Sequence, residues 1–294
     1  MSNYVVTCSS TVDMPLEFFE KRHVNFACFT FTIDNVTYDD DMGKSMPLDE
    51  FYNRIRNGAM PTTSQINVGQ FIEFFTPFLE KGLDIVHVTL SSGISGVFNS
   101  ATIAVNELRE KYPERKIYLS NSLSASSGYG LLIDMALDLR DGGANASEVY
   151  DWIELNKLKI NHWFFTTDLT HLRRGGRISA PAAFFGSMLN ICPVLTVDKE
   201  GKLAPVSKVR GKAYAMAEVL KKMETNAADG YNYNGKCFIS HSSCYEDARK
   251  LADLIDDKFP FIKGRVQIYN IGTVIGSHTG PGTVALFFYG NENR

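Results

Sequence analysis

The first half of the chain alternates short strand-like runs with helix-like runs, and this rhythm limits the possible folds more than any other feature. The run DIVHVTL at 84–90 is rich in β-branched residues, and SSGISG separates it from a stretch with helical spacing at about 98–111. Strand-like KIYLS and a helix over 124–140 come next. Because parallel strands need long crossovers, which are usually helices, these units predict a parallel sheet with helices on both faces.

From about residue 160 the pattern changes. NHWFFTT is strand-like, PAAFFGSMLN predicts a short apolar helix, and PVLTVDKEGKLAPVSKV predicts two strands joined by a turn at 198–201. Strands joined by a tight turn are antiparallel. We therefore predict an α/β protein of two domains. Residues 1–160 form a parallel-sheet α/β/α domain, and residues 161–294 form an α/β domain with a mixed or antiparallel sheet.

Composition narrows the class of protein. The 294 residues carry a net charge of −3, which gives no bulk attraction to nucleic acid or to an anionic membrane. The five cysteines are scattered and never occur as C-x-x-C, as expected for reduced thiols. The start, MSNYVVTCSS, lacks the regions of a signal peptide, and no run reaches the ~20 apolar residues of a membrane helix. We expect a soluble cytoplasmic protein that binds no nucleic acid.

Three clusters of small polar residues are candidates for binding an anion. They are PTTSQIN at 61–67, SSGISG at 91–96 and GSHTGPG at 276–282, each expected at the boundary of an element. Unpaired backbone amides at a helix N-terminus, together with serine and threonine hydroxyls, suit a carboxylate or a phosphate. The same residue types are favoured helix caps, so capping is the alternative for each cluster.

The serines do not match the pattern of a hydrolase nucleophile. The nucleophile elbow requires G-x-S-x-G, whereas Gly93, Ser95 and Gly96 have a different spacing. His241 and His278 occur in suggestive places, but the sequence positions no acid to orient either one. We therefore predict that SSGISG holds an anion, and we assign no catalytic residue.

Motifs for nucleotides and metals are also missing. The chain has neither G-x-x-x-x-G-K-S/T nor G-x-G-x-x-G after a strand. The acidic run DDD at 39–41 has the oxygen ligands that a hard cation prefers, but a solvated loop is the simpler interpretation. We predict no metal site and no cofactor.

A basic run around two glycines is more specific. In LRRGGRISAPAAFFGSML, Arg173, Arg174 and Arg177 surround the Gly-Gly turn, and Lys208 and Arg210 add positive charge nearby in SKVRGK. The guanidinium fork matches two oxygens of a carboxylate or phosphate. The alternative is a basic surface loop.

Taken together, these segments resemble the DegV family in order and spacing along nearly the whole chain. One such match would be weak, but six in order are specific. They are VVTCSSTVDMP, PTTSQ, SSGISGVFNSA, THLRRGGRIS, NICPVLTVDKEGKLAPVSKVRG and IGSHTGPGTVALFFYG.

The resemblance implies a protein, not itself an enzyme, that binds a long-chain fatty acid between two α/β domains. Hydroxyl groups hold the carboxylate, and the acyl chain enters an apolar tunnel. The bound acid is then presented to a separate fatty-acid kinase, which makes an acyl phosphate for phospholipid synthesis. The partners implied are the fatty acid and the kinase catalytic subunit, with at most transient contact with a membrane. QFIEFF and AAFFGSML are candidate tunnel walls.

The family's binding residues carry over by motif. Arg177, with Arg173 beside it, is placed near the exposed carboxylate or at the kinase interface. The predicted fatty-acid-binding residues are Thr63, Ser64, Ser91, Ser92, Ser95 and His278.

The chain also departs from the family pattern at three places. Cys8 stands where the family usually has an aspartate, which puts any role of that acid in doubt. Ile66 and Asn67 follow T-S-Q in place of Pro-Ser, and Phe98 replaces a usual tyrosine, which can alter the loop or the preferred chain length. The competing hypothesis is a serine hydrolase acting on acyl esters with Ser92 and His278.

Overall fold

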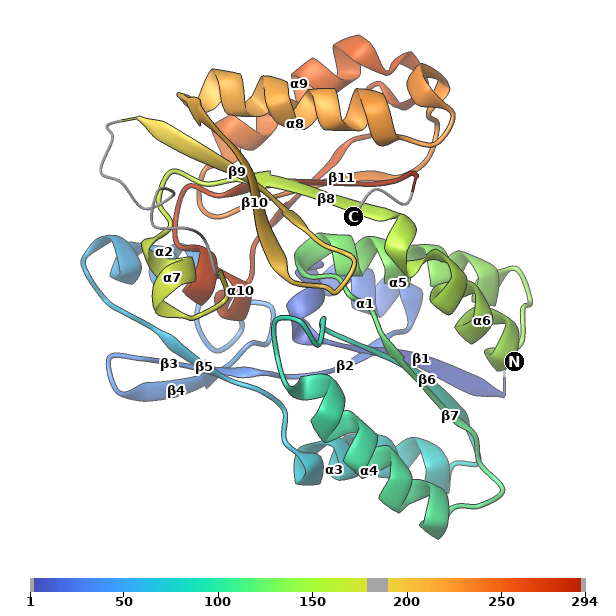
Figure 1. Cartoon of the computed structure of the whole chain (residues 1–294). Helices are drawn as coiled ribbons and strands as arrows, with labels where there is room; N and C mark the ends of the chain where they lie inside the picture. The colour runs from blue at the N-terminus through green and yellow to red at the C-terminus, as the bar shows by residue number, and fades with distance from the viewer. Residues whose placement is uncertain (1–2, 179–189, 292–294) are drawn as a thin grey trace.

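The computed structural model describes residues 3–178 and 190–291, and its main elements form alternating layers of helices and sheets (Figure 1). Helices α3 and α4 cover the outer face of a four-stranded sheet, and α8 and α9 cover the outer face of a six-stranded sheet. Helices α5 and α6 lie between the two sheets. The predicted α/β fold class is confirmed. The bounds of these helices are Val68–Glu80 for α3, Val97–Lys111 for α4, Ser126–Asp141 for α5, Ala146–Asn156 for α6, Lys212–Asn226 for α8 and Tyr245–Lys258 for α9.

The four-stranded sheet is parallel throughout, in the order β2-β1-β6-β7. Its strands read as apolar, β-branched runs because helices cover both faces. The helical crossovers predicted from the strand–helix rhythm are present, with α4 joining β6 to β7. The strand bounds are Tyr4–Ser9 for β1, Asn25–Ala27 for β2, Asp84–Thr89 for β6 and Ile117–Asn121 for β7.

The six-stranded sheet is mixed, in the order β10-β9-β8-β13-β11-β12. Its pairs are antiparallel except for β11 and β12, so the predicted mixed sheet is confirmed. The predicted hairpin is β9–β10, with its turn at 198–201. The predicted helix PAAFFGSMLN falls largely outside the described residues, and the division into two domains at residue 160 stays a prediction. The strand bounds are Ile160–Phe165 for β8, Ile191–Val197 for β9, Leu203–Arg210 for β10, Cys237–His241 for β11, Gln267–Asn270 for β12 and Val284–Tyr289 for β13.

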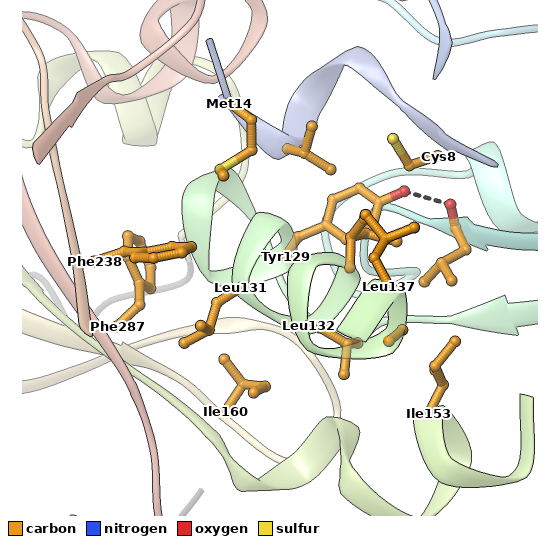
Figure 2. Packing of buried hydrophobic residues seen from close by; sticks show 14 of the residues in the cluster. Cys8, Met14, Tyr129, Leu131, Leu132, Leu137, Ile153, Ile160, Phe238 and Phe287 are labelled. Carbon is orange, nitrogen blue, oxygen red and sulfur yellow. Dashed lines mark hydrogen bonds between the residues drawn. The ribbon is translucent and has the colours of Figure 1, made fainter. Parts of the chain in front are cut away.

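Helix α5 fills the space between the two sheets. Figure 2 shows Phe238 and Phe287 of the six-stranded sheet on one side of this helix and Cys8 of β1 on the other. Gly128 lets the helix approach closely, because a Cβ there would lie 2.4 Å from Nε2 of His162. Leu131 of α5 is completely buried, and a leucine buried to this degree contributes roughly 1.5–3 kcal/mol to stability. One apolar core therefore joins the two sheets.

A third, smaller sheet and several short helices lie beside the main layers (Figure 1). The antiparallel strands run in the order β4-β3-β5, and α10 packs against β3, β5, α2 and α7. The sequence pattern did not predict α10. No helix in the part of the chain that the structure describes is long and apolar enough to cross a membrane. The bounds are Thr30–Ile33 for β3, Val36–Asp39 for β4, Thr62–Ser64 for β5, Leu16–Arg22 for α1, Leu48–Arg56 for α2, Thr170–Arg174 for α7 and Thr273–Thr279 for α10.

Candidate functional site

Segments far apart in the sequence meet at a polar pocket of about 360 Å³, which we call the polar mouth. Strand β5, the loop before α4, the turn after α7 and helix α10 each contribute polar side chains to it. These segments belong to three of the motifs singled out in the sequence and to the Gly-Gly turn. The polar side chains that line the mouth are Thr63, Ser64, Gln65, Ser95, Arg177 and His278.

A threonine–histidine pair lies in the polar mouth. The Oγ1 of Thr63 is 2.8 Å from Nε2 of His278, although 215 residues separate them. Burial and the nearby Arg177 and Arg174 lower the pKa of His278 to about 4. The imidazole is therefore neutral at pH 7. If Nε2 carries the proton, it donates to Thr63, and the threonine hydroxyl hydrogen is then free to point toward a carboxylate.

The other ring nitrogen of His278 lies against backbone. Its Nδ1 is buried and has no hydrogen-bond partner within the described residues. A Cβ added to Gly175 would lie 2.3 Å from this Nδ1, so only glycine leaves room for the imidazole here. The first glycine of the Gly-Gly turn therefore permits the position of His278.

The arginines hold the Gly-Gly turn against the N-terminal half of the chain. Arg177 donates from Nε to the carbonyl of Ile94 at 3.2 Å and from a terminal nitrogen to the carbonyl of Gly175. Arg174 donates to the carbonyl of Pro61 at 3.0 Å, and Arg173 is exposed. Arg177 thus places positive charge in the mouth, where an anion would be attracted.

The serines of SSGISG divide between two roles. Ser91 is buried and donates to the carbonyl of Gly201 at 2.7 Å, which docks the β9–β10 turn onto this loop. The hydroxyl of Ser92 accepts from Asn121 at 2.7 Å. Ser95 accepts from the N–H of Val97 at 3.2 Å, at the start of α4, and it also lines the mouth. Ser91 and Ser92 are not among the lining residues of the polar mouth.

Two local expectations differ from the structure. The cluster GSHTGPG was expected to offer free amides, but α10 ends at Thr279, so the free groups there are carbonyls. The run at 39–41 was expected to be a solvated loop, yet Asp40 is buried and accepts a hydrogen bond from Thr273 at 2.6 Å. No cluster of three or more potential metal ligands occurs within residues 3–178 and 190–291.

The positions that depart from the family pattern are mostly packed in the interior. Cys8 is completely buried, and burial raises the pKa of its thiol, so it is an inert part of the core. Ile66 is buried, Phe98 is half-buried, and Asn67 caps α3 by accepting from the N–H of Gln70.

An apolar cavity adjoins the polar mouth, and the two share Ile94, Arg177, Ile275 and His278. It extends to Phe287 of the six-stranded sheet, and its volume is about 60 Å³. The predicted wall QFIEFF contributes no lining residue among those described, and AAFFGSML lies outside the described residues. A polar pocket beside an apolar cavity is the arrangement that suits an amphipathic ligand with an anionic head.

The hydrolase hypothesis finds no support in the hydrogen bonds of the site. A Ser–His–acid series needs the histidine bonded to the nucleophile on one side and to an acid on the other. His278 bonds Thr63 through Nε2, and its Nδ1 has no partner within the described residues. Ser92 is bonded to Asn121.

Comparisons with known proteins identify the family. Residues 4–291 match the family model of the DegV family, a family described as uncharacterised. A DegV domain-containing protein of Clostridium perfringens is 38% identical over 294 residues, covering 100% of both chains.

Two solved structures are similar to the whole chain. A fatty-acid-binding DegV family protein from Thermus thermophilus has a TM-score of 0.86 at 26% identity and covers 98% of this chain and 99% of its own. DegV of Bacillus subtilis, described as a fatty acid binding protein, has a TM-score of 0.81 at 25% identity and covers 99% and 100%. From the motifs, the fold and these similarities, we conclude that the chain belongs to the DegV family.

Proposed function

We propose that this protein binds a long-chain fatty acid, with the carboxylate in the polar mouth and the acyl chain in the apolar cavity. The observation that carries the proposal is the Thr63–His278 pair at the junction of the two spaces. Arg177 and the hydroxyls of Thr63, Ser64 and Ser95 supply donors and charge for a carboxylate. Fatty-acid binding by two structurally similar DegV proteins supports this choice of ligand.

The acyl chain supplies most of the affinity in this proposal. Each buried CH₂ contributes about 0.8 kcal/mol, whereas the polar contacts mainly fix the orientation of the head group. Pockets for small ligands usually measure about 300–1,000 Å³, and the apolar cavity measures about 60 Å³. A long chain therefore enters only as side chains along the cavity, such as Ile275 and Phe287, move aside.

Native mass spectrometry of the freshly purified protein, followed by organic extraction, tests the ligand directly. We expect a stoichiometric long-chain fatty acid, or uptake of added oleate or palmitate by delipidated protein. Thr63→Ala should weaken that binding about tenfold, whereas Thr62→Ala, the exposed neighbour on the same strand, should not. A folded protein that neither carries nor takes up fatty acid would refute the proposal.

We further propose that the protein is not an enzyme itself and presents its ligand to a separate cytoplasmic fatty-acid kinase. The exposed Arg173, beside the turn that carries Arg177, is the proposed contact for that partner. The proposed arrangement has two domains, 1–160 and 161–294, with the ligand between them. Incubation with ATP, a fatty-acid kinase and labelled fatty acid should yield acyl phosphate, and Arg173→Ala should lower the yield without lowering fatty-acid affinity. Labelling of Ser92 by a fluorophosphonate probe would instead favour the hydrolase.

A further inference from the structure

The first residues of α10 lie against two buried carboxyl groups. Asp40 is only 4% exposed, and the hydroxyl of Thr273 donates to its Oδ1 at 2.6 Å. Asp13 is 5% exposed, and the hydroxyl of Ser126 donates to its Oδ2 at 2.5 Å. These four residues come from segments that are far apart in the sequence. The carboxyl of Asp40 therefore joins α10 to the N-terminal half of the chain, whereas the hydroxyl bond of Asp13 lies within that half.

Both carboxyl groups converge on Gly272, the residue before α10. A Cβ at Gly272 would lie 2.6 Å from Oδ1 of Asp13 and 3.4 Å from Oδ1 of Asp40. Burial is the main cause of the raised pKa of each aspartate, and the charge of Asp40 also raises that of Asp13. The backbone amides of Gly272, Thr273 and Val274 and the hydroxyl of Thr273 oppose this rise from the start of α10, and the hydroxyls of Ser126 and Ser10 oppose it from the N-terminal half of the chain. Tyr52 adds a third link, because its hydroxyl donates to the carbonyl of Ile271 at 2.8 Å.

The other end of α10 carries the site. His278 follows Thr273 by five residues, about 7.5 Å along a helix. A side-chain bond also links them, because the hydroxyl of Ser277 donates to the carbonyl of Thr273 at 2.7 Å. Ile275 and His278 line both the polar mouth and the apolar cavity. A shift at the anchored end is therefore transmitted to the imidazole.

We propose that Asp40 and Asp13 are positioning residues for the ligand site: by holding the first turn of α10, they place His278 against Thr63. This inference rests on the proposed function of that site. It gives a function to one aspartate of the acidic run at 39–41, which the sequence alone indicated to be a solvated loop. The two carboxyl groups touch no ligand in this proposal and act only through α10.

The competing explanation is that these carboxyl groups only stabilise the fold. Asp40→Asn and Thr273→Val each weaken the hydrogen bond between Thr273 and Asp40, one from the acceptor side and one from the donor side. Thr273→Ser keeps the hydroxyl. Asp39→Asn is the matched control, since it removes an exposed carboxylate one residue away. We would measure the Kd of hexadecanoic acid and of hexadecanol for each variant, after urea unfolding has shown that the variant is folded.

A positioning role predicts a selective loss. Asp40→Asn and Thr273→Val should weaken binding of the acid about tenfold and leave binding of the alcohol unchanged. When either is combined with His278→Ala, the affinity for the acid should fall no further than in His278→Ala alone. Thr273→Ser and Asp39→Asn should bind the acid like the parent. Equal losses for acid and alcohol, additive losses in the double variant, or no loss in a folded variant would each overturn the proposal.

A second readout needs no ligand, so it separates this proposal from the proposed function. In the parent, NMR titration should give His278 a pKa of about 4. Moving the imidazole toward water should raise the pKa of His278 toward 6.5 in Asp40→Asn and Thr273→Val. A parent that binds no fatty acid refutes the proposed function, whereas an unchanged His278 pKa in both variants refutes the positioning role.

Discussion

Two threonine–histidine pairs in different regions of the molecule have similar geometry but different surroundings. Thr7 is paired with His87 at 2.9 Å inside the parallel sheet, and Thr63 is paired with His278 at 2.8 Å in the polar mouth. Burial is the main cause of the lowered pKa of each histidine, to about 3 for His87 and about 4 for His278. Both imidazoles are therefore neutral at pH 7.

The surroundings of the two pairs differ. His87 contacts the rings of Phe71, Phe74 and Phe75, and burial, with no charged neighbour among the described residues, lowers its pKa. His278 lines two cavities, and Arg177 and Arg174 contribute to its low pKa. The pair alone therefore does not define a binding site. What distinguishes the candidate anion site from the core contact is the open space beside the pair and the nearby cations.

The largest expected effect comes from removing the core imidazole. His87→Ala leaves a cavity among phenylalanine rings, and we expect the free energy of unfolding to fall by roughly 3 kcal/mol, as for other large core side chains. Fatty-acid affinity of the folded fraction should not change. Urea unfolding and a binding titration check this, with exposed His23→Ala as the control. A loss of affinity with unchanged stability would show that the two pairs had been assigned the wrong way round.

Acid should destabilise the protein through both histidines. In the folded state the pKa values of His87 and His278 lie below the ordinary 6.5, so the stability contributed by the neutral imidazoles is present above pH 6.5. It is lost as the pH falls toward about 4 for His278 and about 3 for His87. The slope is at most about 1.4 kcal/mol per pH unit for each group.

The raised pKa values of Asp13 and Asp40 act in the opposite direction, because a protonated buried carboxyl stabilises the fold at low pH.

To isolate the contribution of His87, the test compares the unfolding free energy of the parent with that of His87→Phe between pH 7 and pH 3. We expect a shallower decline in the variant. Parallel curves would mean that His87 titrates normally in the folded protein.

The sequence predicted much of the fold, but only part of the contrast between the two threonine–histidine pairs. The strand–helix rhythm and the hairpin around 198–201 were sufficient to predict a parallel sheet and a mixed sheet, because local periodicity and turn chemistry determine them. Family motifs, rather than periodicity, singled out Thr63 and His278, which lie 215 residues apart. No local pattern could show which other residues would approach them.

Ser91 and Asp40 illustrate what the sequence could not show. The hydroxyl of Ser91 belongs to a serine-rich motif, yet it bonds Gly201 across 110 residues instead of lining the mouth. The carboxyl of Asp40 belongs to an acidic run, yet it is buried against α10. Both outcomes depend on tertiary contacts, which override the usual preference of serine and aspartate for caps and solvent.

A smaller effect is expected from crowding the site imidazole. Gly175 has a φ of −70°, which any residue can adopt, so Gly175→Ala should disturb mainly the His278 Nδ1 beside it. We expect fatty-acid affinity to fall about tenfold, equivalent to about 1.4 kcal/mol, with a smaller change in stability. Gly69→Ala in α3 is the control, because among the described residues its added Cβ meets only Asn67, at 3.4 Å. Unchanged affinity for Gly175→Ala would show that the position of His278 does not matter for binding.

The smallest expected effect separates the two threonines. Thr7→Val keeps the shape of the side chain but leaves Nδ1 of His87 without its partner, so we expect a loss of about 1 kcal/mol in unfolding free energy and no change in affinity. Thr63→Val should show the reverse, because water can reach the half-buried mouth while a bound carboxylate loses a donor. Paired measurements of stability and Kd on both variants check the contrast. If both variants lost only stability, Thr63 would be a core residue like Thr7, and the polar mouth would lose its central donor.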